Sequence, residues 1–173
     1  SLLINTDNIT SVGSTVFTKV NSSSSGLGFF VAVGLSGNIV RSTDNGSSFD
    51  NVSSPTSNIL NGVTFGNNTF SAVGDNGTIV RSTDNGSSFD NSTSPTSNKL
   101  WAITFGNNTF SAVGKYGNIV RSTDNGSSWD NATSPTATHL TGVTFGNNTF
   151  VGVGDNGNIV RSTDNGSSWD NAT

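Results

Sequence analysis

An all-β fold built from four similar sheets is the fold class that the 173-residue sequence predicts, and three observations lead to it. First, an eight-residue segment, Ser42 to Phe49, recurs from Ser82, Ser122 and Ser162, each copy forty residues after the previous one. Second, short runs of β-branched and aromatic residues alternate with Asn/Asp-Gly turns, as in antiparallel hairpins. Third, no stretch favours a helix. Each forty-residue unit is therefore expected to form one antiparallel meander.

The chain begins with segments that depart from the repeat. Residues 1–10 match nothing later and are expected to form a lead-in, and 11–52 form a divergent first blade with a candidate strand at Val16 to Val20. Because the chain contains no Met, Ser1 is not an initiator, and we expect a processed product or part of a longer protein. The regular blades follow at 53–92, 93–132 and 133–173.

The unit 53–92 shows the whole pattern. Its expected strands are Leu60 to Phe65, Thr69 to Val73, Thr78 to Thr83 and Ser88 to Asn91. Tight turns join them, and a polar linker with Pro95 leads to the next unit, where a missing N–H does no harm. A forty-residue period of four strands is typical of propeller blades. The sequence therefore predicts a β-propeller with four blades in this chain.

The repeated eight-residue segment is expected to close the hairpin between the third and fourth strands. Its Gly supplies a positive φ, and its Asp carboxylate can accept hydrogen bonds from amides of the same turn. The aromatic residue three positions after the Gly is expected to pack as a hydrophobic anchor. The residues given this structural role are Ser42, Asp44, Gly46, Phe49, Ser82, Asp84, Gly86, Phe89, Ser122, Asp124, Gly126, Trp129, Ser162, Asp164, Gly166 and Trp169.

These segments, STDNGSSF and STDNGSSW, resemble the Asp-box, S/T-x-D-x-G-x-x-W/F, of sialidases and many other propellers. The longer run from Val73 to Phe89 is similar to the repeats of photosystem II stability/assembly factors. The resemblance covers roughly Phe29 to Thr173 and implies a propeller whose relatives usually have more blades. The ring is therefore closed by four blades, by a homo-oligomer, or by additional blades, and we favour the last two.

Composition excludes several classes of partner. A net charge of −4 with seven basic residues disfavours nucleic acid. No apolar run approaches the ~20 residues that span a bilayer, so membrane insertion is not expected. With no Cys and one His, no metal site or cofactor is expected. The polar, Lys-poor composition favours an extracellular or cell-surface location, with periplasm or lumen as further settings.

Catalysis is not expected. The resemblance to sialidases implies three clustered Arg, a Tyr nucleophile with a Glu partner, and an Asp acid, yet the chain has no Glu and one Tyr. Its arginines hold one place per unit, which spreads them around the ring. We expect them to bridge adjacent strands or to pair with Asp50, Asp90, Asp130 or Asp170 of a neighbouring blade, or else to face an anionic partner. These arginines are Arg41, Arg81, Arg121 and Arg161.

The units differ mainly at the start of the first strand and at the turn after the second, two places that meet at one edge of a meander. A candidate ligand-binding cluster of aromatic and cationic residues is therefore expected on this rim. The competing interpretation is neutral variation, with Trp101 packed between blades. The candidate residues are Lys99, Trp101, Lys115, Tyr116 and His139.

A non-catalytic, rigid module that binds carbohydrate or protein through this rim is the function that the sequence favours. Two alternatives stay open. By resemblance, the chain is an assembly or stability factor for a membrane complex such as photosystem II. The other is a sialidase-like glycoside hydrolase, which needs a pair of carboxylates.

Overall fold

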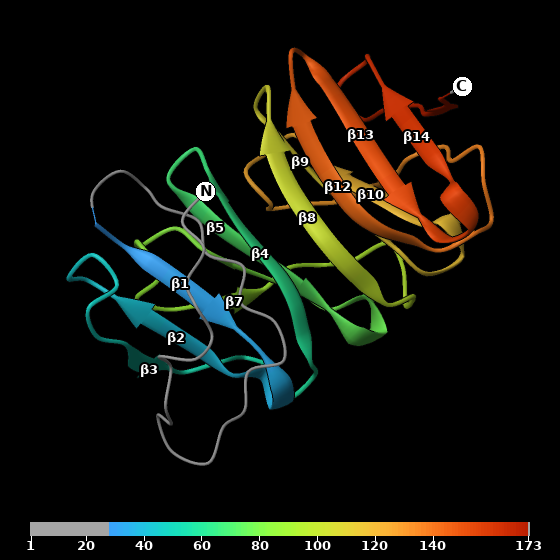
Figure 1. Cartoon of the computed structure of the whole chain (residues 1–173). Coiled ribbons are helices and arrows are strands. Elements are labelled where there is room, and N and C mark those ends of the chain that lie inside the picture. Colours follow the sequence, from blue (N-terminus) through green and yellow to red (C-terminus); the bar gives the residue numbers. More distant parts are fainter. Residues whose placement is uncertain (1–27, 173) are drawn as a thin grey trace.

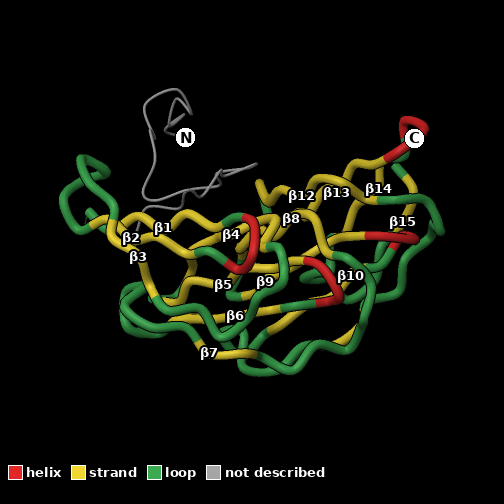
Figure 2. Tube along the Cα trace, turned by 90° about the horizontal axis from the view of Figure 1, so that it is seen from below, coloured by secondary structure: helices red, strands yellow, loops and turns green. Residues whose placement is uncertain are grey.

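The computed structural model describes residues 28–172, whose strands form one three-stranded and three four-stranded antiparallel sheets (Figure 1). The remaining described segments are loops and short 3-10 turns (Figure 2). The expected lead-in and the candidate strand at Val16 to Val20 lie outside the described residues. Within 28–172, no helix is long and apolar enough to cross a membrane.

The four sheets are named blades 1 to 4 in chain order. Blade 1 contains β1 (Phe30–Val33), β2 (Ile39–Ser42) and β3 (Asp50–Val52). Blade 2 contains β4 (Leu60–Gly66), β5 (Thr69–Gly74), β6 (Ile79–Ser82) and β7 (Asp90–Asn91). Blade 3 contains β8 (Leu100–Gly106), β9 (Thr109–Gly114), β10 (Ile119–Ser122) and β11 (Asp130–Asn131). Blade 4 contains β12 (Leu140–Gly146), β13 (Thr149–Gly154), β14 (Ile159–Ser162) and β15 (Asp170–Asn171).

A 3-10 turn links the second and third strands of blades 2 to 4, and the equivalent strands β1 and β2 of blade 1. These turns are η2 (Leu35–Gly37), η3 (Asp75–Gly77), η4 (Lys115–Gly117) and η5 (Asp155–Gly157). The central residue of each has a positive φ, for example 55° at Asn76 and 60° at Tyr116. The strand order follows the chain in every sheet, so each blade is the meander that the sequence predicts.

The observed strand ends differ slightly from the expected ones. The fourth strand of blade 2 is β7, which begins at Asp90 rather than Ser88, because the Ser88 amide donates to the Asp84 carboxylate. Ser88 thus belongs to the turn. Only two residue pairs, Val80 with Asn91 and Arg81 with Asp90, connect β6 to β7. The outermost strand of the blade is correspondingly short.

The blades pack face to face in chain order, and the contacts between them are most extensive along their first strands, β4, β8 and β12. Three apolar clusters fill the interfaces between successive blades. At one of them, Val73 and Ile79 of blade 2 pack with Phe110 and Trp129 of blade 3. This radial packing of antiparallel sheets is a β-propeller arrangement, and the predicted fold class with four blades is confirmed.

Candidate functional site

The turns of the blades lie on two opposite rims. We call uniform rim the edge formed by the Gly-Asn-Asn turns and the Asp turns (the segments starting at Ser42, Ser82, Ser122 and Ser162). Asn67 of a Gly-Asn-Asn turn donates to the side-chain oxygen of Asn125 in an Asp turn, at 3.1 Å, which places both turn types together. We call varied rim the other edge, with the 3-10 turns and the starts of the first strands. Here the Lys115 amide donates to the Lys99 carbonyl at 2.8 Å.

Each Asp turn is held by its own carboxylate. Asp124 accepts hydrogen bonds from the Ser122 hydroxyl at 2.8 Å, the Ser128 amide at 2.9 Å and the Ser128 hydroxyl at 2.6 Å. The Ser122 hydroxyl accepts in turn from the Gly126 amide at 2.9 Å. The other three copies repeat this set of bonds. These carboxylates therefore act on their own backbone.

The same bonds stabilise the charged form of the four carboxylates. For Asp44 and Asp164, hydrogen bonds led by Ser42 and Ser168 respectively lower the pKa to about 2, against 3.8 ordinarily. For Asp84 and Asp124, partial burial raises the pKa, and the bonds from the turn outweigh it, so the pKa again falls to about 2.

The aromatic residue that ends the Asp turn packs into a blade interface in blades 2 to 4. Trp129 and Trp169 are buried, and the Trp129 ring N–H donates to the Gly126 carbonyl at 3.2 Å. Phe89 is buried as well, whereas Phe49 of blade 1 is half-buried. The Asp turns of blades 2 to 4 are thus joined to the core by their aromatic residues.

Two of the four repeated arginines, Arg41 and Arg121, connect neighbouring blades, but through a different acceptor from the Asp residues that the sequence suggested. Arg41 of blade 1 donates to the Asn85 carbonyl of blade 2 at 2.6 Å, and Arg121 of blade 3 to the Asn165 carbonyl of blade 4 at 3.3 Å. Within residues 28–172, the only ion pair joins Lys99 to Asp75, so the expected partners Asp50, Asp90, Asp130 and Asp170 form none.

On the varied rim, three rings from two blades form a continuous row. His139 of blade 4 lies between Trp101 and Tyr116 of blade 3, with ring centroids 5.2 and 5.4 Å away. The Tyr116 amide donates to His139 Nδ1 at 3.1 Å, which fixes the imidazole. We call Trp101, His139 and Tyr116 the aromatic row. The structure thus brings together the three aromatic candidates that the sequence placed on this rim.

A β-bulge explains why Trp101 belongs to the rim and not to the core. In β8 the pairing with β9 shifts between Leu100 and Ala102, which leaves Trp101 as the extra residue. Leu100 and Ala102 are buried, while Trp101 is half-buried against His139. Asn61 and Thr141 hold the same bulge position in blades 2 and 4. The sequence pattern did not reveal this bulge.

Tyr116 has an unusual backbone for its side chain. Its φ is 60°, and the other non-glycine residues with positive φ in the described part of the chain are Asn or, once, Ser36. Such a φ is uncommon for a bulky residue and costs conformational energy. The Tyr116 side chain is also 58% exposed, so core packing does not compensate for this cost.

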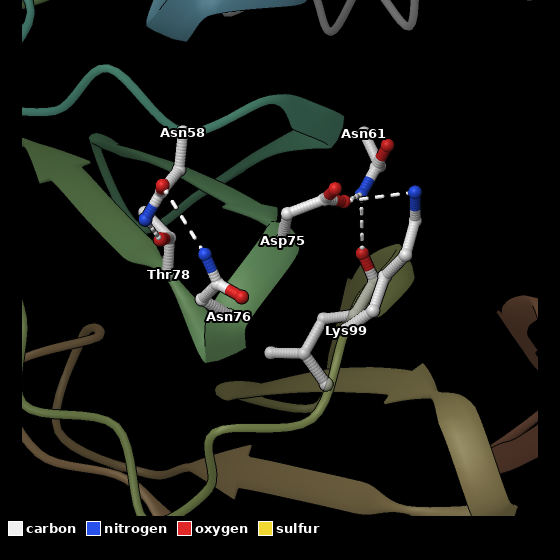
Figure 3. Close-up of polar contacts among 7 residues, drawn as sticks. Asn58, Asn61, Asp75, Asn76, Thr78 and Lys99 are labelled. Atoms are coloured by element: carbon white, nitrogen blue, oxygen red, sulfur yellow. Dashed lines mark hydrogen bonds and ion pairs between the residues drawn. The ribbon is translucent and has the colours of Figure 1, made fainter.

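The two lysines of the rim have different surroundings. Lys99 pairs with Asp75 of blade 2 at 2.8 Å, and Asn61 donates to the same carboxylate and to the Leu100 carbonyl, both at 2.9 Å (Figure 3). Lys115 instead places its ammonium 4.7 Å from the centre of the Tyr116 ring. Burial raises the pKa of Asp75, but the bonds from Lys99 and Asn61 outweigh burial and lower it. Lys99 therefore joins two blades, while Lys115 extends the aromatic row.

Asp75 and Asn61 are rim residues that the sequence reasoning did not include among the candidates. Both stand at positions that vary between units, since Asn61 aligns with Trp101 and Asp75 with Lys115. That alignment was the available signal. Chemically, the rim presents ring faces, one ammonium and amide groups, which suit stacking and hydrogen bonding. In the described part of the chain, no three His, Cys, Asp or Glu residues gather as metal ligands.

Comparisons with known proteins show the fold. The chain superposes on the structure of YCF48 bound to D1 peptide with a TM-score of 0.70 and 19% identity, covering 88% of this chain and 52% of that one. For YCF48 from Cyanidioschyzon merolae the TM-score is 0.67, with 15% identity and 89% and 55% coverage. For the GH74 enzyme of Niastella koreensis it is 0.63, with 20% identity and 91% and 25% coverage.

The chain therefore spans about half the length of the YCF48 structures that it resembles. No protein-family model matches the sequence, and no curated protein does so either. At these identities the likeness establishes the propeller fold and leaves activity to be argued from the site.

Proposed function

We propose that the chain is a non-catalytic binding module that recognises a segment of a protein partner through the varied rim, in an extracellular, periplasmic or lumenal setting. The observation that carries the proposal is the aromatic row, with Lys115 above its exposed end. Aromatic side chains bury a large apolar area at low entropic cost and are enriched where proteins bind one another.

The backbone of Tyr116 supports recognition over neutral variation. A Tyr with a φ of 60° and a 58% exposed side chain carries a conformational cost that burial in the core does not offset. The equivalent residues Asn76 and Asn156 have the same backbone and a side chain that suits it. Retaining a Tyr here makes sense if its ring contacts a ligand.

The comparisons favour a protein partner. One structurally similar protein, YCF48, is seen bound to a D1 peptide, which supports peptide recognition on this fold. That support is by fold alone, because identity is 19%. The role of assembly factor for a membrane complex is one form of the same proposal.

Carbohydrate is the second candidate, and the ring geometry favours it. Neighbouring rings of the row are tilted by 56° and 60°, so their faces form an uneven platform on which a sugar ring could stack. The amide of Asn61 is already engaged with Asp75 and Leu100, so the hydrogen bonds to such a ligand would come from Lys115 and exposed rim turns.

A binding screen with matched variants tests the proposal. The chain and its Trp101→Ala/Tyr116→Ala variant are probed on a peptide array and a glycan array. The control is Thr141→Ala/Asn156→Ala, which changes the same two positions in blade 4. We expect ligands of the parent to be lost in the first variant and kept in the control.

The outcomes separate the candidates. Signals on the peptide array alone support a protein partner, and signals on the glycan array alone support carbohydrate. Ligands that bind both variants as well as the parent would remove the varied rim as the site.

A further inference from the structure

The fourth blade exposes a face whose counterpart is buried in the other blades. Val73 and Val113 are 0% exposed and Ile79 and Ile119 are 1% exposed, because each pair is covered by the following blade. Their counterparts Val153 and Ile159 are 45% and 44% exposed. We call the surface around Val153, Ile159, Gly146 and Gly157 the open face.

Two glycines show what shape of partner the open face fits. At Gly66 and Gly106, an added Cβ would overlap the ring of Phe105 or Phe145 of the next blade, so each glycine seats an aromatic ring. Gly146 has nothing within 4 Å of that position and is exposed. At Gly146 the fourth blade therefore has the space that an aromatic ring of the next blade fills at Gly66 and Gly106, and no ring occupies it.

The second glycine, Gly157, is also uncovered, whereas its equivalents in blades 2 and 3 are covered by the next blade. The equivalent Gly77 and Gly117 lie against the carbonyls of Thr96 and Thr136, which belong to the linker entering the next blade. Gly157 has nothing within 4 Å. The position thus fits the linker of a blade.

Three features of the open face match those that blades 2 and 3 present to the blade that follows them. These are the apolar pair Val153 and Ile159, the uncovered Gly146 and the uncovered Gly157. The open face is therefore complementary to a blade of this same repeat.

We propose that the open face binds a further four-stranded blade of the same forty-residue pattern. The three interfaces already present in the molecule are the template. Blade 1 of a second copy is a poorer occupant, because Phe30, Ala32 and Val40, on its side opposite to blade 2, are already 8%, 0% and 2% exposed.

Because the chain contains no Cys, a single introduced Cys would be its only thiol, and the reactivity of that thiol reports how exposed its position is. Ile159→Cys introduces one thiol on the open face, and Ile119→Cys introduces the matched thiol on a covered face. Each is made in the parent chain and in an extended chain, which carries a second copy of residues 134–173 after Thr173, so that the forty-residue period continues.

The labelling rate of the thiol is the measurement. In the parent, Ile159→Cys should react with a thiol reagent about tenfold or more faster than Ile119→Cys. In the extended chain the two should react at similar, slow rates. A copy in which the counterpart of Phe145 is changed to Ser should restore fast labelling, which separates docking from mere attachment.

Gly146→Ala provides a second readout that does not depend on labelling. It should leave the unfolding midpoint of the parent unchanged but lower that of the extended chain by about 5 °C, as Gly106→Ala does in both. Equal labelling of Ile159→Cys in both chains, or a neutral Gly146→Ala in the extended chain, would overturn the proposal. Concentration-dependent protection in the parent would overturn it in favour of a second copy.

Discussion

The two rims of the propeller come from the same repeat, yet they use their polar side chains in different ways. On the uniform rim the Asp124 carboxylate bonds to the turn that carries it, and all four blades repeat the arrangement. On the varied rim the side chains that differ between units make contacts to a neighbouring blade, as from Lys99 to Asp75 and from His139 to the Tyr116 amide. A substitution on the first rim thus weakens the blade that carries it, whereas one on the second changes a surface.

The comparison explains where variation is tolerated. Bonds within a turn require Ser, Asp and Gly at fixed spacing, so every unit needs the same residues there. The 3-10 turns close through backbone bonds, as from Thr78 to Asp75 and from Asn118 to Lys115. Because these bonds use no side chain, the side chains of the varied rim are free to differ. Residues with different chemistry can therefore occupy the varied rim without disrupting the fold.

The sharpest test removes a Trp from each rim of the same blade. Trp129→Ala deletes a buried ring and its bond to Gly126, and should lower the free energy of unfolding by about 3–5 kcal/mol. Trp101→Ala deletes a half-buried ring on a bulge and should cost about 1 kcal/mol. Urea unfolding followed by circular dichroism measures both. Equal losses would mean that Trp101 is part of the core.

Acid should weaken the uniform rim through all four Asp turns together. Their pKa values lie at about 2 in the folded chain and near 3.8 when unperturbed, so the folded state favours the charged form. The resulting stability is complete above the unperturbed pKa and is lost as pH falls from about 4 through about 2. Urea midpoints across this range measure it.

A charge-deficient variant provides the control for the acid experiment. Asp124→Asn/Asp164→Asn should show a shallower loss of stability between about pH 4 and 2 than the parent. Because Asp44 and Asp84 still titrate, the loss should not vanish. Identical slopes would mean that the Asp turns do not govern acid stability.

One Asp from each rim gives a smaller contrast. Asp124→Asn keeps one oxygen acceptor but loses the charge that three donors share, and should cost about 1 kcal/mol at this solvent-exposed turn. Asp155→Asn changes an exposed carboxylate of the varied rim and should be neutral within about 0.5 kcal/mol. Thermal unfolding at neutral pH compares them, and a reversed order would contradict the division of roles between the rims.

Much of the fold could be predicted from the sequence because every repeat carries the same turn residues at the same spacing. Turn residues at fixed spacing located the hairpins, and the forty-residue period gave the blades. The ends of the strands depend on more than the repeat, since Ser88 can either extend β7 or bond to Asp84, and only the geometry of the turn decides between them. The bulge at Trp101 left no mark in the alternation of apolar residues.

The candidate site was predictable in place but not in its contacts. Variation between units identified the rim residues, because identical units highlight any position that changes. Pairing across blades was harder to foresee. Arg121 bonds to the Asn165 carbonyl and not to an Asp, and Lys99 bonds to Asp75, a residue outside the predicted candidates. Such pairs depend on how far one blade is rotated from the next, which the sequence of a single blade does not encode.

Tyr116→Asn is the finest test of the comparison, because it should improve stability while it removes binding. Asn is the residue of blades 2 and 4 at this positive φ, and its short side chain suits the left-handed backbone better than a Tyr ring. The free energy of unfolding should rise by about 0.5 kcal/mol. The reverse change, Asn156→Tyr in blade 4, should lower it by a similar amount. If Tyr116→Asn instead destabilises the chain, the ring serves packing against His139, and the varied rim loses its strongest mark of a recognition surface.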